Sequence, residues 1–202
     1  RAVQALPSNA NAWAGLGTCL LILAQDLIQL DQPLGEKALA KLQEAGRCLD
    51  EAISRGMGSD AVVLNQRANV LNLSRRWAEA AEAYRRAADA APPDFASLPR
   101  QNLALALLEM GDGLGAEKTA ADILLKNPEF VDARALLAAL RWEKGDLVLA
   151  ETSWGEICGD VKPEEPADFI GKLGVAFGIA KAPKIGGELF CSMYSEMSIV
   201  RG

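Results

Sequence analysis

Two Gly-Asp pairs set the strongest constraint on the fold of this chain. Gly111 and Gly145 lie 34 residues apart, and each joins two stretches in which apolar residues recur at helical spacing. A turn between two such stretches predicts a helical hairpin. A fixed recurrence of this length predicts an array of hairpins, each of which packs on its neighbours. We therefore expect an all-α chain.

The same register extends over three segments, which end at Pro92, Pro128 and Pro163. Proline lacks an amide donor and disfavours helix in the residue before it, so each junction ends one hairpin before the next begins. Small residues occupy matching places, where they let the helices of a hairpin approach closely: Ala68, Ala104 and Ala138 in the first helices, and Ala80, Ala116 and Ala150 in the second. The recurrence therefore reflects helix packing.

The segments resemble the tetratricopeptide repeat (TPR) family, whose signature places tryptophan, leucine and glycine in the first helix and alanine, an aromatic residue and proline further on. The sequence AWAGLG matches the first part with Trp13, Leu16 and Gly17, and WAEAAEAY matches the second part with Tyr84 and the following Pro92. The resemblance implies a right-handed superhelical array of antiparallel helical hairpins, a TPR-like solenoid. It also implies that the chain binds other proteins or peptides.

Three residues depart from the family pattern. Arg67 and Arg141 stand where large apolar or aromatic residues are usual in the first helices, and Ala120 replaces the aromatic residue of a second helix. We expect these departures to weaken single repeats without changing the register.

The pattern predicts a repeat domain over residues 1–163 and a different region over residues 164–202. Within the repeat domain we expect a partial repeat 1–8, an extended hairpin 9–58, and repeats 60–93, 95–128 and 130–163. After Pro163 the periodicity fails, and we expect a capping helix from Ala167 to Ala180 and then an irregular, glycine-rich tail. The partial repeat predicts either that the natural protein extends further towards the N-terminus or that a partner covers this end.

The extended hairpin is longer than the others, since 48 residues separate Trp13 from Ala61. The extra length is expected in both helices, the first of which would reach about Leu30. Two interpretations stay open. The hairpin packs on itself, or its tip projects and docks a specific partner.

Charge and residue types exclude several classes of function. The chain carries 21 basic and 27 acidic residues, and this net charge of −6 would repel a phosphate backbone, so we expect no nucleic-acid partner. Histidine is absent, which removes the commonest general base and metal ligand. No nucleophile and base stand at recognisable spacing, so we predict no enzyme activity, no cofactor and no metal site within these residues.

The cysteines bear on the compartment. Cys19, Cys48, Cys158 and Cys191 form no C-x-x-C pair, and we interpret them as reduced, mostly buried thiols. They favour a reducing compartment, either the cytoplasm or an organelle interior.

The longest apolar stretch, around residues 16–30, does not predict a membrane span. It contains Gln25, Asp26 and Gln29, whose burial in lipid would be costly. We therefore expect a soluble protein.

In the family that the chain resembles, the first helices of successive hairpins line a concave groove, and this selects three groups of residues. The second unit offers Val62, Asn65, Gln66, Asn69 and Asn72; the third offers Leu98, Gln101, Asn102, Leu105 and Leu108; the fourth offers Asp132, Ala135, Leu136, Ala139 and Trp142. The expected groove runs from amide-rich to apolar.

From these groups we select a candidate peptide-binding or protein-binding set: Asn65, Asn69, Asn72, Asn102, Leu105, Leu108 and Trp142. An amide side chain carries both a donor and an acceptor, so a row of asparagines can pair with the backbone of an extended peptide whatever its sequence. The alternative is that these asparagines bind only water. The apolar members would anchor a ligand or cover the C-terminal tail.

Three functions stay open. The leading one is a non-enzymatic scaffold that is a structural or assembly subunit of a larger multiprotein complex. The second is a peptide-recognition module that uses the asparagine-lined groove. The third is the regulatory repeat region of a larger enzyme, since repeats of the family that the chain resembles occur in glycosyl transferases and phosphatases.

Overall fold

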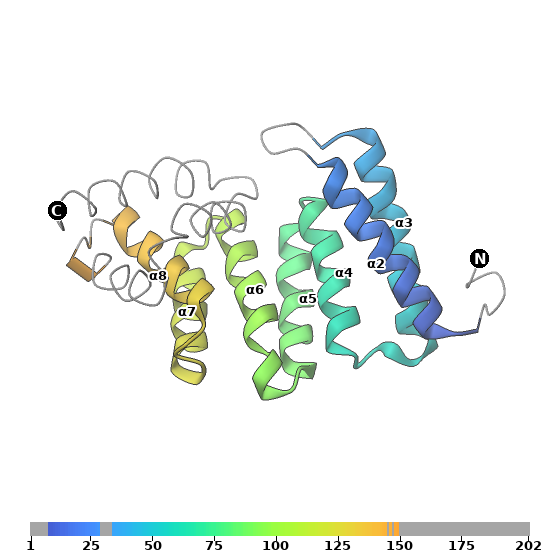
Figure 1. Ribbon diagram of the computed structural model, residues 1–202. Coiled ribbons are helices and arrows are strands. Elements are labelled where there is room, and N and C mark those ends of the chain that lie inside the picture. The colour runs from blue at the N-terminus through green and yellow to red at the C-terminus, as the bar shows by residue number, and fades with distance from the viewer. Residues whose placement is uncertain (1–7, 29–33, 145, 147, 150–202) are drawn as a thin grey trace, which may run out of the picture. The chain divides into compact units, whose positions relative to one another are not determined.

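The computed structural model describes residues 8–28, 34–144, 146 and 148–149 (Figure 1). Residues 1–7 of the predicted partial repeat, the end of the fourth repeat, the predicted capping helix and the tail lie outside the described residues. The chain divides into two compact units, Arg1–Gly111 and Asp112–Gly202, which we describe one at a time.

All the regular secondary structure among the described residues is helical. The first unit contains α2 (Ala10–Leu27), α3 (Glu36–Ala52), α4 (Ala61–Leu73), α5 (Trp77–Ala90) and α6 (Ser97–Glu109), and the second contains α7 (Gly113–Lys126) and α8 (Val131–Lys144). Two short turns, Ile53–Met57 and Pro93–Phe95, follow α3 and α5. Figure 1 shows α2 beside α3 and α4 beside α5, each pair joined as an antiparallel hairpin. The predicted all-α class is confirmed.

Side-chain caps begin three of the helices. Asn9 Oδ1 accepts from the Ala12 amide before α2 at 3.2 Å, and Asp60 Oδ1 accepts from two amides at the start of α4 at 2.9 and 3.0 Å. Asp112 Oδ1 accepts from the Gly115 amide at 2.9 Å at the start of α7. Such caps satisfy amides that the first turn of a helix leaves without partners. The Gly-Asp pair at 111 and 112 therefore ends one helix and starts the next.

The turn between α4 and α5 holds a non-glycine residue in the left-handed region. Arg75 has φ 61°, and Gly111, which occupies the same place after α6, has φ 83°. The Arg75 amide donates to Asn72 O and the Arg76 amide to Leu71 O, both at 2.9 Å. This pair of bonds closes the end of α4 in the manner of a Schellman motif. An L-residue is strained there, whereas glycine is not.

The small residues predicted at helix contacts are buried where the structure describes them, and Ala150 lies outside the described residues. Five of them expose 0% of their surface: Ala68, Ala80, Ala104, Ala116 and Ala138. Alanine at these places lets helix backbones approach closely, which explains the recurrence of small residues along the chain.

The first hairpin is longer than the second, because α2 and α3 have 18 and 17 residues whereas α4 and α5 have 13 and 14. Its core joins Leu20, Leu21 and Ala24 of α2 to Leu42 and Leu49 of α3. The first helix ends at Leu27 rather than near Leu30.

The closest approach in this hairpin is at Gly17 of α2. A methyl group added there would lie 2.7 Å from Cγ of Leu49 and 3.3 Å from the carbonyl oxygen of Ala45, both in α3. The glycine of the AWAGLG motif therefore permits helix contact.

The two cysteines within the described residues are free thiols. Cys48 is buried in the hairpin core, and that burial raises the pKa of its thiol. Cys19 is exposed and does not share the burial that was expected of most of the thiols. It lies on α2 between the buried residues Gly17 and Leu20, off the face that packs on the core.

Within the described part of the chain, no helix is both long enough and apolar enough to cross a membrane.

Candidate peptide-binding surface

The amide face, as we name it, comprises Asn65, Asn69 and Asn72 of α4 with Asn102 of α6. The three α4 residues are spaced by four and three positions, which places them on one side of the helix. Asn102 Nδ2 donates a 3.2 Å hydrogen bond to Asn65 Oδ1, so the face continues from α4 onto α6. The structure therefore brings together the four asparagines that the sequence selected.

Asn69 is fixed by the core of its own hairpin. The Tyr84 hydroxyl of α5 donates to Asn69 Oδ1 at 2.7 Å. Tyr84 is only 2% exposed, and burial raises the pKa of its phenol, so the hydroxyl stays protonated and available as a donor. The amide of Asn69 is thereby oriented, with its oxygen towards the core.

Asn72 is the most deeply buried member of the amide face. Its side chain is 8% exposed, and its Oδ1 is buried without a hydrogen-bond partner among the described residues. A buried acceptor of this kind costs free energy when unpaired and gains a bond when a donor reaches it.

A polar contact also joins α2 to α4. Thr18 Oγ1 lies 2.6 Å from Gln66 Oε1 and 2.9 Å from Ala14 O, and its single proton can be donated to one oxygen at a time. Polar side chains of this region thus lie on three helices of the first unit, α2, α4 and α6.

Exposed apolar side chains lie near the N-terminal ends of α4 and α6. Val62 in α4 and Leu98 in α6 are 65% and 54% exposed. Leu105 and Leu108 are half-buried, and Gln101 is buried. Exposed apolar groups beside oriented amides are what a protein ligand needs for both binding energy and orientation.

In the second unit the expected groove is closed over much of α8. Asp132 is exposed, but Ala135, Leu136 and Ala139 are all buried and cannot line an open surface. Trp142 lies within α8, and its side chain is outside the described residues. Of the apolar residues selected for binding, only the half-buried Leu105 and Leu108 of α6 have side chains that the structure describes.

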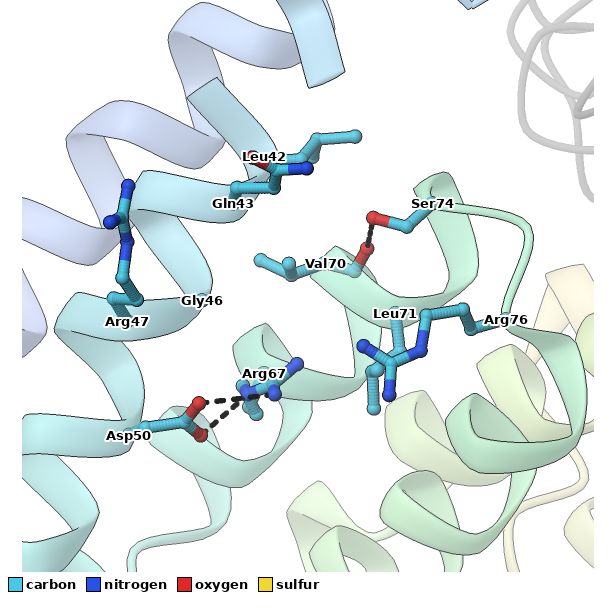
Figure 2. Close-up of a pocket in the computed structure, with 10 residues that line it drawn as sticks. All are labelled: Leu42, Gln43, Gly46, Arg47, Asp50, Arg67, Val70, Leu71, Ser74 and Arg76. Carbon is cyan, nitrogen blue, oxygen red and sulfur yellow. Dashed lines mark hydrogen bonds and ion pairs between the residues drawn. The ribbon is translucent and has the colours of Figure 1, made fainter. Parts of the chain in front are cut away.

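A cleft that was not predicted from the sequence lies between α3 and α4. This arginine cleft, as we name it, has a volume of about 370 Å³ (Figure 2). Its lining residues are Leu42, Gln43, Gly46, Arg47, Asp50, Arg67, Val70, Leu71, Ser74 and Arg76. Gly46 keeps its floor open, because a methyl group there would contact Cγ1 of Val70 at 3.4 Å.

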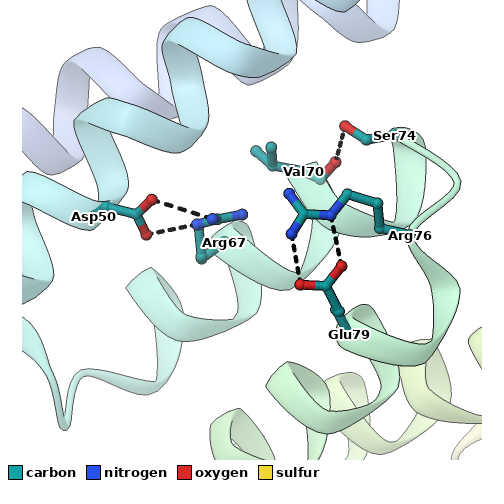
Figure 3. A network of polar contacts seen from close by, with 6 residues as sticks. All are labelled: Asp50, Arg67, Val70, Ser74, Arg76 and Glu79. Carbon is teal, nitrogen blue, oxygen red and sulfur yellow. Dashed lines mark hydrogen bonds and ion pairs between the residues drawn. The ribbon is translucent and has the colours of Figure 1, made fainter.

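Two carboxylate pairs organise this cleft (Figure 3). Arg67 donates to both oxygens of Asp50 at 2.7 and 3.1 Å, and Arg76 donates to both oxygens of Glu79 at 2.7 and 2.5 Å. The Arg76 guanidinium holds the pKa of Glu79 below its usual range. Arg67 thus occupies a position that is usually apolar, and it does so by pairing with Asp50 of the preceding helix. The acidic residue Asp50 was the one sign in the sequence that could have predicted this pair.

Among the described residues, no group of three or more histidine, cysteine, aspartate or glutamate side chains could hold a metal ion.

Several solved structures share this fold. MamA is 15% identical with a TM-score of 0.63, over 78% of this chain and 81% of that chain. Pseudomonas aeruginosa pilF is 18% identical with a TM-score of 0.65, over 96% and 85%. YrrB, described as a TPR protein with an unusual peptide-binding site, is 16% identical with a TM-score of 0.56, over 91% and 86%. At such identities the likeness concerns the fold alone.

No curated protein matches the chain. The family model for the tetratricopeptide repeat matches residues 36–95 and 102–157, more than half of the chain. Members of this family are generally non-catalytic modules that bind other proteins or peptides. The chain therefore belongs to the tetratricopeptide repeat family and is a protein–protein interaction scaffold.

Proposed function

We propose that this scaffold holds an extended segment of a partner protein on the amide face of α4 and α6. The observation that carries the proposal is the orientation of two amides. Asn65 Oδ1 accepts from Asn102 and Asn69 Oδ1 accepts from Tyr84, so the oxygens are occupied within the protein. The Nδ2 groups of Asn65 and Asn69 have no acceptor among the described residues, which makes them the donors for a ligand.

An extended peptide supplies the complementary groups. Its backbone carbonyl oxygens can accept from Nδ2 of Asn65 and Asn69. Val62 and Leu98 offer apolar contact beside these amides. Backbone pairing of this kind recognises an extended conformation, and the apolar contacts add preference for particular side chains.

The test is a variant that changes the donors and leaves the internal bonds in place. In Asn65→Asp with Asn69→Asp, each carboxylate oxygen still accepts from Asn102 or Tyr84, while both outward N–H donors are lost. Peptides would be selected from a displayed library on the wild-type chain, and their affinities compared on the two proteins by calorimetry. We expect affinity to fall by about tenfold or more, since about 1 kcal/mol or more is lost per bond.

Two controls make this experiment decisive. The circular dichroism and thermal unfolding of the variant must match those of the wild type, and the affinity must be compared in high salt so that the new negative charges are screened. Equal affinity of the selected peptides for both proteins would contradict a binding role for the amide face.

A second candidate is a complex subunit held through the long first hairpin. Apolar side chains near the end of this hairpin are exposed: Ile22 and Leu23 by 51%, Leu27 by 47% and Leu39 by 37%. Exposed apolar groups of this density are typical of contact sites. Under this candidate, Ile22→Ser with Leu23→Ser would release co-purifying subunits that Asn65→Asp with Asn69→Asp retains. The reverse pattern would favour the amide face.

A further inference from the structure

The arginine cleft lies on the side of α4 opposite the amide face. Successive residues of a helix are turned by about 100°, so Arg67, Val70 and Ser74 lie roughly half a turn from Asn65 and Asn69. Figure 2 shows Arg67 bound to Asp50 of α3 and Val70 pointing towards α3. The two surfaces are therefore separate and can be occupied together.

Positive charge gathers here in a chain that is acidic as a whole. Three arginines, Arg47, Arg67 and Arg76, line the cleft with one acid, Asp50, although the net charge of the chain is −6. Glu79 adds a second carboxylate beside Arg76. Local cations in an acidic chain indicate a specific contact rather than general attraction of polyanions.

The positive charge of Arg47 is not neutralised by the acidic residues near it on α3. The three acids within about one helical turn of it are each paired with a different base, since Glu44 contacts Lys41, Asp50 contacts Arg67 and Glu51 contacts Arg55. Within the described part of the chain, Arg47 itself has no ion pair, and it is exposed. An incoming carboxylate would be its first partner.

Arg75 gives a second, independent sign. It adopts φ 61° at the turn position that glycine occupies after α6, and it stands between the cleft residues Ser74 and Arg76. It is exposed and has no ion pair among the described residues. Glycine would adopt this backbone conformation without strain, so an arginine here suggests that its positive charge serves a function.

We infer that the arginine cleft is a second docking site, for an acidic segment of a partner protein that presents side-chain carboxylates. Two of the three cleft guanidinium groups, those of Arg67 and Arg76, already bind a carboxylate through two parallel hydrogen bonds each, as Figure 3 shows for Asp50 and Glu79. Both of these acids are more than half exposed, at 55% and 58%. Ligand carboxylates can thus replace them, or bind Arg47 and Arg75 directly.

The probe is a labelled peptide that alternates glutamate with serine, with a matched peptide that alternates glutamine with serine. Fluorescence anisotropy on the full chain is expected to show binding of the glutamate peptide only, weakening as salt is added. Arg47→Gln with Arg75→Gln is expected to weaken binding by about tenfold. Arg86→Gln is the matched control, since Arg86 is an exposed arginine of α5 that does not line the cleft, and it should bind as the wild type does.

A variant that binds the glutamate peptide more tightly would distinguish a true binding site from a loss of binding caused by destabilisation of the fold. Asp50→Asn removes the internal carboxylate that occupies Arg67 and is expected to tighten binding of the glutamate peptide several-fold. An unchanged affinity in both Arg47→Gln with Arg75→Gln and Asp50→Asn would overturn the inference. Binding of anionic lipid vesicles without binding of the glutamate peptide would also overturn it.

Discussion

The hydroxyl of Tyr84 on α5 donates a 2.7 Å hydrogen bond to Oδ1 of Asn69 on α4. One partner belongs to the buried core and the other to the amide face, because Tyr84 is 2% exposed whereas Asn69 is half-buried. The bond therefore fixes a surface amide from within the hairpin. A protein ligand would meet a group whose orientation is set before binding, which lowers the entropic cost of recognition.

The two ends of this bond should respond differently to removal. Asn69→Ala leaves a buried hydroxyl without an acceptor and is expected to lower the free energy of unfolding by about 1–3 kcal/mol. Tyr84→Phe leaves only the half-buried amide, which water can reach, and is expected to cost about 1 kcal/mol or less. Urea denaturation of both variants measures the difference. A larger loss in Tyr84→Phe would show that the bond is not the main role of Asn69.

Tyr84 also predicts a dependence of stability on high pH. Burial raises the pKa of this phenol in the folded state above its unfolded value of about 10. Below about pH 10 both states are protonated and the contribution is complete, and above it the unfolded state ionises first, so stability falls by up to about 1.4 kcal/mol per pH unit. Tyr84→Phe should lack this part of the decline. Parallel curves for the two proteins would contradict the prediction.

Two glycines of α2 offer a matched pair of substitutions. At Gly17 an added methyl group would meet Leu49 at 2.7 Å and the Ala45 carbonyl oxygen at 3.3 Å, so Gly17→Ala should destabilise the chain by about 1–3 kcal/mol. A methyl group added at Gly15 would have no neighbouring atom within 4 Å. Gly15→Ala should therefore stabilise the chain by about 0.5–1 kcal/mol, because alanine has the higher helix propensity. Thermal unfolding of the two variants should shift in opposite directions. Shifts of the same sign would refute the close approach at Gly17.

The strained turn makes a prediction in the opposite sense. Arg75→Gly should raise the free energy of unfolding by about 0.5–1 kcal/mol, because glycine accepts φ 61° without a steric cost. Gly111→Ala, at the equivalent turn with φ 83°, should lower it by a similar amount, about 1 kcal/mol. Chemical denaturation of both variants is the measurement. A destabilised Arg75→Gly would mean that the arginine side chain stabilises the turn through contacts.

The helical hairpins could be predicted from sequence because their signals are local. Apolar spacing, the small residues Ala68 and Ala80, and the Gly-Asp turn at 111 and 112 each act over a few residues along the chain. Asn65 and Asn102 were selected from the sequence as members of one surface, and their side chains do contact each other, while their role in binding stays a prediction.

Pairings across helices could not be predicted in the same way. The sequence suggested that Asn69 faces a groove, but it did not show that Tyr84 occupies its oxygen. Arg67 read as a departure from the family pattern, whereas the structure pairs it with Asp50, which lies 17 residues earlier on another helix. Such contacts depend on how two helices are rotated against each other, and that rotation is a tertiary property.

The sequence also did not predict correctly which residues of α8 are exposed. Ala135, Leu136 and Ala139 have the spacing of a groove-lining face but are buried, because apolar periodicity alone does not separate a core contact from an exposed one. The roles predicted for Leu105, Leu108 and Trp142 stay predictions, and so do the boundaries of the repeat domain.

Two-dimensional NMR of the asparagine side-chain amides shows most directly whether the amide face binds a peptide. Isotope-labelled chain would be titrated with a library-selected peptide, with the exposed Asn11 of α2 as an internal control. If the amide face binds the peptide backbone, the Nδ2 signals of Asn65 and Asn69 will shift in proportion to occupancy while that of Asn11 stays in place. A bound peptide that leaves the signals of Asn65 and Asn69 unmoved would contradict the account.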